Sequence, residues 1–599
     1  MRLLRVDLTE CRLTVEESEP ELAGRYLGGV GLALKLLADE VGPATRATDR
    51  ANRVVFAAGP LSGTPFPATA TAVVATKSPL TGTLVESTLS GDWAQALGQS
   101  GYSAIVVAGA SARPVYLDVD REGARLRDAS GLWGLDPDAA RETLAEDAPA
   151  ARVLTIGVAG ERRIPLAALV DDRGAAVGRG GVGAVLGAKG LKAIVLRGGR
   201  RAPVADGERL RDLTRRWSTA WARNSYLSLL TKFGTAAELD SGWSTGHVPV
   251  GNWRGAASGW KEGCLRLGGR AFVDAYDQPH ESCPGCPVRC TRQADTGEAG
   301  RFAMSGPGPD YEALAALGAL SRVDDLVGVC YASHLANRYG LDPVSTGAAI
   351  AFAFEAAERG LSAASDAGVA LRWGSAEALV ELVRQVGEGS RLGALLGKGV
   401  RAAADAVGRE ADGLAVHVGG LEPPPVEPRA YPSLAVHYAT GPWAEGTLSL
   451  WFERSIAWPE LGVNYRHGRF DPDGKGLLAK VGQDWLAALG SLGLCPRVAQ
   501  AIPPYQVAQV ATAATGVGWT ASELQTLGER VVNLRRAYNR SAVGGEDGLP
   551  PRLLEAHAVG PLAGRRIDLP RGLAEHYRLR GWTPAGEPSP ETLERLGLG

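Results

Sequence analysis

The sequence predicts an α+β protein in which a β-rich N-terminal domain precedes two mainly α-helical domains. Up to about residue 205, short apolar segments alternate with turns rich in glycine and proline. From about residue 206 onward, apolar residues recur at helical spacing. A chain of 599 residues is also too long for one domain, and a Pro-rich stretch at 411–430 divides the helical part. We therefore predict domains over residues 1–205, 206–410 and 411–599.

The N-terminal domain is expected to begin with a β-hairpin. Residues 3–15 alternate between apolar and polar side chains around a turn at Thr9-Glu10. Further strands are expected at 53–58, 70–76, 104–108, 115–119, 153–156 and 193–197. Helices are fewer here, at 21–40, 92–100 and 138–146. No repeat of fixed period is visible in the sequence.

The rest of the chain is expected to be mainly helical. Apolar spacing predicts helices at 207–231, 311–316, 324–338, 344–358, 376–386 and 392–407. Helices are expected to dominate up to about residue 540, and the tail after Pro550 is expected to be irregular.

Charge and cysteine content exclude several classes of protein. The net charge of −2 gives no electrostatic basis for binding nucleic acid or an anionic membrane. No run of 18 apolar residues and no signal-peptide pattern is present, so we expect no membrane span. Seven cysteines are an odd and small number for a secreted disulfide scaffold and fit a reducing, cytoplasmic environment.

One short loop concentrates the chemistry of the cysteines. Cys283, Cys286 and Cys290 have the spacing C-x2-C-x3-C, and the prolines between them disfavour a regular helix. Three thiolates this close can share one soft metal centre, which then needs a fourth ligand. Cys495, which a proline follows, is the candidate. A compact triplet with a distant fourth cysteine suits a [4Fe–4S] cluster.

Two other interpretations of these cysteines stay open. A structural zinc site usually has two C-x2-C pairs or a mixture of Cys and His at short spacing, and this chain has one such pair. The thiols could also bind no metal.

Three glycine-containing segments are candidates for cofactor contacts. In residues 178–187, glycines let backbone N–H groups approach anionic oxygens, and Arg179 can neutralise phosphate. The segment matches neither a dinucleotide-binding fingerprint nor a P-loop, so a phosphate cradle and an ordinary turn are both open. Gly340-Leu341 and Gly493-Leu494 each follow a helix-like run, and in isolation they read as ordinary helix C-caps.

Together these segments resemble the tungsten-containing aldehyde ferredoxin oxidoreductase family over essentially the whole chain. The matching motifs, in the family's order, are residues 5–8, 26–32, 59–65, 76–82, 178–187, 339–342 and 493–495. The resemblance implies a base domain of β-sheets with two helical domains that close over a bis-pyranopterin (molybdopterin) centre with tungsten or molybdenum. It also implies a neighbouring [4Fe–4S] cluster on the four cysteines and a magnesium ion between the pterin phosphates.

The resemblance also implies which residues contact the cofactor. They are Thr71, Thr88, Ser90, Ala175, Ala176, Arg179, Gly180, Gly181, Asn337, Gly340, Leu341, Asp342, Gly493 and Leu494. Thr71 stands where the family has a basic residue that links pterin and cluster. Thr88 stands where it has an Asn whose backbone helps hold magnesium. The two pterin motifs, which begin with Asp in typical members, begin here with Asn337 and Gly490.

The implied catalytic residues depart from the family in part. Glu312 matches the family's active-site Glu, a general acid or base, although a carboxylate there could also be a helix N-cap. The family's active-site His falls near Thr447, and His437, Tyr438 and Glu445 are nearby candidates to replace it.

The activity implied by the resemblance is the two-electron oxidation of an aldehyde to a carboxylic acid, an aldehyde:ferredoxin oxidoreductase reaction. Electrons would leave singly through the cluster to ferredoxin or a small Fe–S subunit. The family also forms homodimers. One alternative is a reductase of the same architecture acting on an aromatic acyl-CoA or a 2-oxo acid. The other is a non-catalytic electron-transfer subunit.

Overall fold

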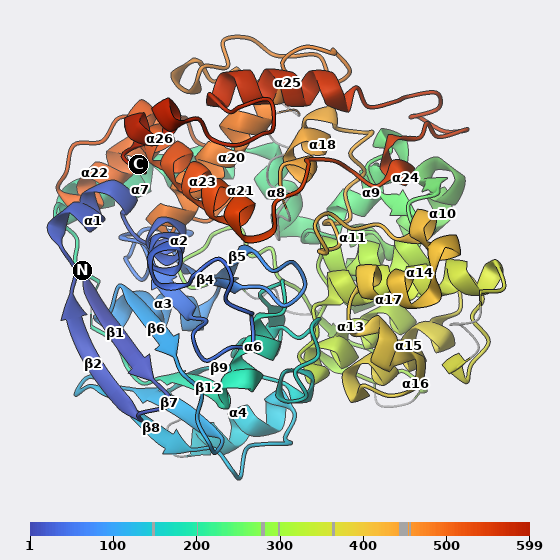
Figure 1. Cartoon of the computed structure of the whole chain (residues 1–599), viewed down its shortest axis with the longest axis horizontal. Coiled ribbons are helices and arrows are strands. Elements are labelled where there is room, and N and C mark those ends of the chain that lie inside the picture. The colour runs from blue at the N-terminus through green and yellow to red at the C-terminus, as the bar shows by residue number, and fades with distance from the viewer. Residues whose placement is uncertain are drawn as a thin grey trace.

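The fold was analysed in a computed structural model that describes residues 1–146, 150–200, 202–276, 282–297, 300–361, 366–441, 453 and 457–599. A β-rich N-terminal part lies on one side of the molecule, and helices make up the rest (Figure 1). The predicted fold class is therefore confirmed. The division at 205/206 and 410/411 stays a proposal.

Two six-stranded sheets form the N-terminal part. The first has the order β2-β1-β6-β3-β4-β5, and only β1 and β6 run parallel. Its strands are β1 (Arg2–Asp7), β2 (Arg12–Glu17), β3 (Val54–Ala58), β4 (Thr71–Lys77), β5 (Leu84–Ser90) and β6 (Ala104–Ala108). The second has the order β8-β7-β12-β9-β10-β11, and only β7 and β12 run parallel. Its strands are β7 (Val115–Val119), β8 (Ala124–Asp128), β9 (Arg152–Ile156), β10 (Leu169–Val170), β11 (Ala176–Val177) and β12 (Leu191–Leu196).

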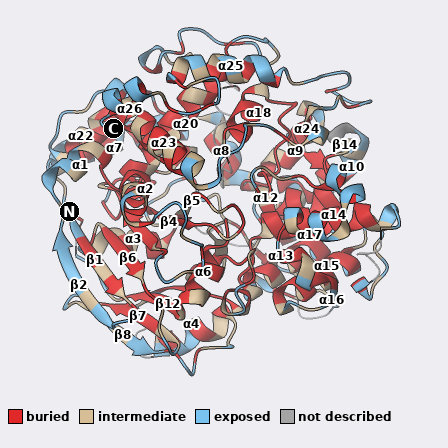
Figure 2. Cartoon of the chain, in the orientation of Figure 1, coloured by how far each residue is buried: buried red, intermediate tan, exposed pale blue. Residues whose placement is uncertain are grey.

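The second sheet repeats the topology of the first, since each strand number rises by six and each pairing keeps its direction. No sequence repeat predicted this, because pairing topology depends on backbone hydrogen bonds and not on matching side chains. The two sheets share one hydrophobic core, to which alternate residues of both contribute, among them Phe56 and Ile156. The other face of the first sheet packs mainly against the helix at residues 29–40, which in turn packs against helices at 475–492 and 521–543 (Figure 2).

The predicted strands are present, and two full-length strands were missed. The missed β5 contains Glu86, Ser87 and Thr88, whose polar side chains line cavities on either side of the strand. The missed β8 is largely exposed, with a polar sequence. β5 therefore lacks the apolar alternation that a strand prediction needs, and in β8 the alternation is confined to Ala124 and Leu126.

The single helix predicted at 21–40 is wrong. Two helices occur there, α1 (Pro20–Tyr26) and α2 (Gly29–Glu40), separated at Leu27-Gly28. The break follows from tertiary packing: a Cβ atom on Gly29 would lie 2.0 Å from the carbonyl oxygen of Gly490. The other helices of this part are α3 (Asp92–Gln99), α4 (Pro137–Glu146), α5 (Val158–Glu161) and α6 (Val182–Lys189).

The remaining residues form the helical part. Its first helices are α7 (Gly207–Ala222), α8 (Ser225–Phe233), α9 (Ala237–Thr245), α10 (Lys261–Leu267), α11 (Gly269–Tyr276), α12 (Tyr311–Ala313), α13 (Leu326–Tyr339), α14 (Pro343–Glu358), α15 (Ala376–Glu388), α16 (Arg391–Leu396) and α17 (Val400–Val407). The helix predicted at 207–231 is two helices, because Asn224 caps α8 by accepting a hydrogen bond from the Leu227 amide at 3.0 Å.

The last part contains α18 (Pro432–Ala439), α20 (Lys475–Leu492), α21 (Pro496–Ala499), α22 (Pro504–Thr515), α23 (Ala521–Val543), α24 (Pro551–Leu554), α25 (Leu569–Arg580) and α26 (Pro590–Leu596). The expectation of an irregular tail after Pro550 is thus wrong. Helix α25 is fixed to α20 by a buried ion pair in which Arg580 Nη1 donates to Asp484 Oδ1 at 2.9 Å.

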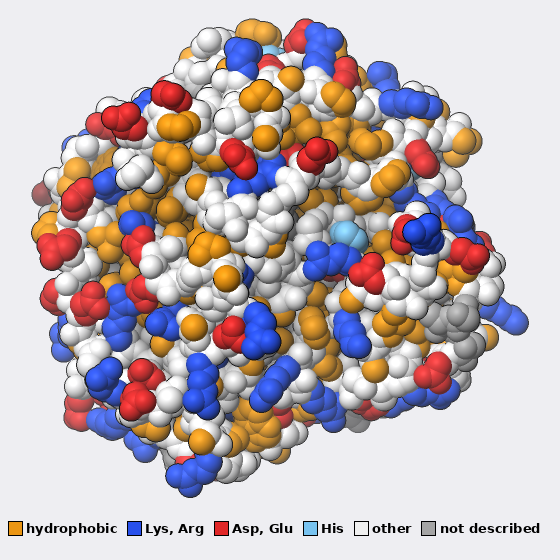
Figure 3. Space-filling model, in the orientation of Figure 1, with side chains coloured by type: hydrophobic (Ala, Val, Ile, Leu, Met, Phe, Trp, Pro, Cys, Tyr) orange, Lys and Arg blue, Asp and Glu red, His pale blue; other side chains and the backbone are white. Residues whose placement is uncertain are grey.

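The surface reflects the near-zero net charge. On the face drawn in Figure 3, acidic and basic side chains are interspersed. Among the described residues, no helix has both the length and the apolar character needed to cross a bilayer.

Candidate metal and cofactor site

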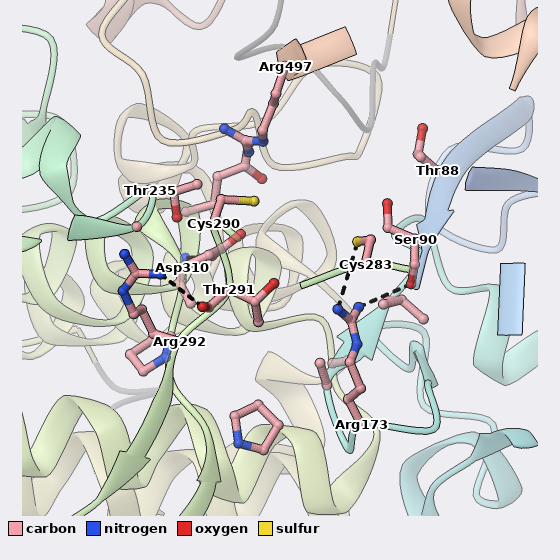
Figure 4. Close-up of a pocket in the computed structure, with 18 of the residues that line it drawn as sticks. Thr88, Ser90, Arg173, Thr235, Cys283, Cys290, Thr291, Arg292, Asp310 and Arg497 are labelled. Carbon is pink, nitrogen blue, oxygen red and sulfur yellow. Dashed lines mark hydrogen bonds between the residues drawn. The ribbon is translucent and has the colours of Figure 1, made fainter. Parts of the chain in front are cut away.

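A cavity of about 360 Å³ lies where segments distant in sequence meet. Its walls come from β4 and β5, the turn between β10 and β11, the glycine loop, the cysteine loop before β15 (Gln293–Asp295), the start of α12 and the segment 495–498. Figure 4 shows side chains from several of these segments around the cavity. The two sheets and the helical part therefore build this space jointly.

The four cysteines Cys283, Cys286, Cys290 and Cys495 all line this cavity. The first three lie on the loop between α11 and β15, where the Cys286 amide donates to the Cys283 carbonyl at 2.9 Å. Cys495 is the N-cap residue of α21, and its amide donates to the Ala68 carbonyl at 2.8 Å. The fold thus brings the distant fourth cysteine to the triplet, as a shared metal centre requires.

The electrostatics of these thiols favour a metal partner. Burial raises the pKa of Cys283 to about 12, although the positive charge of Arg173 lowers it in part. Burial, followed by the charges of the three loop cysteines, raises the pKa of Cys495 to about 12. Four thiolates would repel one another here, and metal binding offsets that cost.

The spacing of the thiols bears on the kind of metal. Among the described residues, no group of three or more His, Cys, Asp or Glu is gathered tightly enough to hold a single metal ion. The iron–sulfur cluster therefore stays a proposal that rests on the cysteine pattern.

Arg179 joins the glycine loop to the start of α14. Its Nε donates to Asp342 Oδ2 at 2.9 Å, and its Nη2 donates to Ser345 Oγ at 3.0 Å. Gly181 adopts a left-handed conformation with φ of 81°, and a Cβ atom there would lie 2.6 Å from the Pro165 carbonyl oxygen. The arginine lines the cavity, whereas Gly180 and Gly181 lie beside it and allow close packing.

The two Gly-Leu motifs occupy equivalent places in the two sheet repeats. Gly340 caps α13 with φ of 71°, and Gly493 caps α20 with φ of 75°. A Cβ atom on Gly157, after β9, would lie 2.2 Å from the Tyr339 carbonyl oxygen. A Cβ atom on Gly59, after the equivalent β3, would lie 2.3 Å from the Gly493 amide nitrogen. The motifs are helix C-caps, as expected, and each cap also contacts one sheet.

Each motif faces a different cavity. Asn337 and Asp342 line the central cavity, and Leu494 lines a second cavity of about 60 Å³. Thr71 and Thr88 line both. Two adjoining cavities thus each lie beside one motif.

The predicted cofactor residues divide accordingly. Those on the wall of the central cavity are Thr71, Thr88, Ser90, Ala175, Ala176, Arg179, Asn337 and Asp342. Gly340, Leu341 and Gly493 lie behind that wall, with Leu341 fully buried. The Thr71 hydroxyl is buried and has no hydrogen-bond partner among the described residues, which fits a polar ligand atom beside it.

Glu312 lies on the cavity wall in the first turn of α12. The N-cap of that helix is Asp310, whose Oδ1 accepts a hydrogen bond from the Ala313 amide at 2.9 Å. Glu312 is therefore not needed as the cap. Burial and then the charge of Glu312 raise the pKa of Tyr438 well above its usual value, so the two groups interact electrostatically.

The other catalytic candidates are less well placed. The Tyr438 hydroxyl donates to the Pro424 carbonyl at 2.9 Å. His437 is buried on the wall of the second cavity. Glu445 and Thr447 lie outside the described residues.

Several arginines on the cavity wall were missed by sequence reasoning. They are Arg173, Arg292 and Arg497. Arg292 follows the cysteine triplet by two residues and donates to the Arg289 and Thr231 carbonyls at 2.7 Å each, which ties the cysteine loop to α8. Arg497 follows Cys495 by two residues, so proximity to a ligand cysteine was the available signal. Arg173 has no such signal.

Comparisons with known proteins agree with this architecture. The family model "Aldehyde ferredoxin oxidoreductase, N-terminal domain" matches residues 3–198, and the model "Aldehyde ferredoxin oxidoreductase, domains 2 & 3" matches residues 212–598. The tungsten-containing aldehyde ferredoxin oxidoreductase of Pyrococcus furiosus is 33% identical over all of this chain and 98% of its own. The counterpart from Thermococcus kodakarensis is 32% identical with the same coverage.

Two further relatives have other activities. The WOR-like subunit of an aliphatic sulfonate oxidoreductase from Pyrococcus furiosus is 28% identical over all of this chain and 97% of its own. The solved active-site complex BamBC of benzoyl coenzyme A reductase, in complex with 1,5-dienoyl-CoA, superposes with a TM-score of 0.86. It is 26% identical, over all of this chain and 97% of that one.

Proposed function

The chain belongs to the aldehyde ferredoxin oxidoreductase family, and on that premise we propose that it oxidises an aldehyde to a carboxylic acid. Membership makes it an oxidoreductase that uses a tungsten or molybdenum pterin and an iron–sulfur cluster. In the proposed reaction, aldehyde and water give carboxylic acid, two protons and two electrons. The observation that supports it most is that the four cysteines and Glu312 line one cavity together with Asn337 and Asp342, which flank the first Gly-Leu motif.

The residues present fit these groups. The four cysteines would hold a [4Fe–4S] cluster, since four thiols on the wall of one cavity suit it. The pterins would lie along Thr71, Ser90, Ala176 and the two motifs, with a magnesium ion held near Thr88. When bound, the pterin metal supplies two-electron exchange with the substrate carbon, and the cluster supplies one-electron transfer.

Glu312 is the residue we assign to proton transfer. It lines the cavity, and its carboxylate would take the proton released as water adds to the aldehyde carbon. Tyr438, whose pKa is raised by burial, keeps its proton at neutral pH and holds the wall behind Glu312 through its bond to Pro424. Arg179 fixes the glycine loop through Asp342.

An external electron acceptor is consistent with the exposure of the cysteine loop. Gly285, Pro287 and Arg289 are exposed, while the three cysteines of the same loop line the cavity. The proposed cluster thus lies one loop away from solvent, within reach of ferredoxin or a small Fe–S subunit. A homodimer would leave this proposal unchanged.

A second candidate is a reductase that acts on an aromatic acyl-CoA or a 2-oxo acid. The likeness to the benzoyl-CoA reductase complex favours it. The third possibility, a non-catalytic electron-transfer subunit, would bind iron without tungsten or molybdenum.

Anaerobically purified protein tests these proposals. The first two functions require tungsten or molybdenum together with about four iron per chain. Reduction of a viologen dye by aldehydes then supports aldehyde oxidation. Consumption of an acyl-CoA with a low-potential reductant, without any dye reduction by aldehydes, would replace it with the second function.

A further inference from the structure

We propose that Arg173 is a positioning residue that raises the reduction potential of the iron–sulfur cluster by holding a positive charge against the Cys283 sulfur. The inference rests on the proposed function, because Cys283 must be a cluster ligand. Arg173 Nη1 lies 4.0 Å from Cys283 Sγ, within hydrogen-bonding range of sulfur (Figure 4). The residue belongs to the turn between β10 and β11, far in sequence from the cysteine loop.

The guanidinium is fixed on two sides, which leaves its third nitrogen directed at the sulfur. Nε and Nη2 donate to Asp171 Oδ2 at 3.1 and 2.8 Å. Nη2 also donates to the Ser90 carbonyl at 3.1 Å. The side chain is 15% exposed, so solvent screens its charge only weakly.

The neighbouring backbone leaves room for this guanidinium. Gly91 has a φ of 108°, and a Cβ atom on it would lie 3.0 Å from both Cζ and Nη2 of Arg173. A side chain at the position after Ser90 would therefore press against the guanidinium and shift it by a few tenths of an ångström.

The charge on Arg173 is permanent. An arginine guanidinium is not deprotonated in proteins, and Asp171 beside it favours the charged form. One-electron reduction adds one negative charge to a thiolate-bound cluster and no proton. A fixed cation beside a ligand sulfur therefore stabilises the reduced form more than the oxidised form.

Neighbouring groups do not duplicate this contact. Arg292 donates to backbone carbonyls, and Arg497 interacts with Cys290 at the other end of the loop. Thr71, paired with Ser90 across β4 and β5, offers an uncharged hydroxyl. Arg173 thus links Ser90, on the proposed pterin side, to Cys283, on the proposed cluster side.

The test is a redox titration of the cluster followed by electron paramagnetic resonance. It compares the wild-type protein with Arg173→Met and Arg173→Lys at matched iron content. We expect a lower midpoint potential for Arg173→Met and an intermediate value for Arg173→Lys, which keeps the charge without the planar fork. The matched control is Arg289→Met, which removes an exposed charge from the cysteine loop and should shift the potential less.

The outcomes separate this inference from the proposed function. A wild-type protein without iron or a reducible signal would overturn both. Full iron content with the same midpoint in all variants would overturn only the role of Arg173. Loss of iron from Arg173→Met or Arg173→Lys would also overturn it, since the residue would then act in cluster assembly.

Discussion

The amide of Leu61 donates to the carbonyl of Leu492 at 3.0 Å, which joins the loop after β3 to the end of α20. This contact between residues 431 positions apart depends on Gly59, whose Cα approaches the same backbone closely. The equivalent loop after β9 meets the end of α13 in the same way, through Gly157. The two proposed pterin sites are therefore built on one repeated contact between a strand end and a helix cap.

Replacing Gly59 with alanine should lower the stability of the protein. The added Cβ would lie 2.2 Å from the Leu492 carbonyl carbon, so backbone must move, at a cost of about 1–3 kcal/mol. Thermal unfolding followed by circular dichroism measures it. Gly131→Ala is the matched control, because a Cβ there meets nothing within 4 Å. Equal melting temperatures for the two variants would contradict the prediction.

Asp172 should make stability depend on pH. Burial and then the charges of Asp171 and Asp92 raise its pKa to about 6. The charges of Arg173 and Arg152 act in the opposite direction but are weaker. Because folding raises the pKa of this carboxyl group, its protonation contributes to the free energy of unfolding. That contribution is fully present below pH 4 and is lost as the pH rises through 6. Since the usual pKa of an aspartate is 3.8, the free energy of unfolding is lower by about 3 kcal/mol at pH 7 than it would be with the carboxyl protonated.

Asp172→Asn should therefore be more stable than the wild-type protein at pH 7 and gain little at pH 4. Denaturant midpoints across this range test it, with Asp212→Asn, at a partly exposed position on α7, as the control. Parallel pH profiles for the wild type and Asp172→Asn would rule out the pKa assignment.

Glu312→Gln should reduce aldehyde oxidation by about 10²–10⁴-fold, the range for loss of a general acid or base. The amide keeps the size of the side chain, so iron and tungsten or molybdenum content should not change. Glu262→Gln, at an exposed position of α10, serves as the control. Activity within a few-fold of the wild type would remove Glu312 from the mechanism.

Local patterns were enough to predict much of the fold and part of the site. The cysteine triplet depends on spacing within one loop, and most strands depend on apolar alternation, so both were visible in the sequence. Features set by tertiary contacts were not. The break before α2 depends on the approach of Gly29 to Gly490, and β5 was hidden because its polar side chains face cavities. Arg173 was missed because its contact with Cys283 spans 110 residues.

The most direct test of the central claim is the iron and sulfide content of the wild-type protein beside Cys495→Ser and the control Cys11→Ser. Cys495 lines the cavity with the triplet, whereas Cys11 is exposed. Our account predicts about four iron per chain in the wild type and in Cys11→Ser, and a loss of most of that iron in Cys495→Ser. A full complement of iron in Cys495→Ser, or one zinc in place of iron in the wild type, would contradict it.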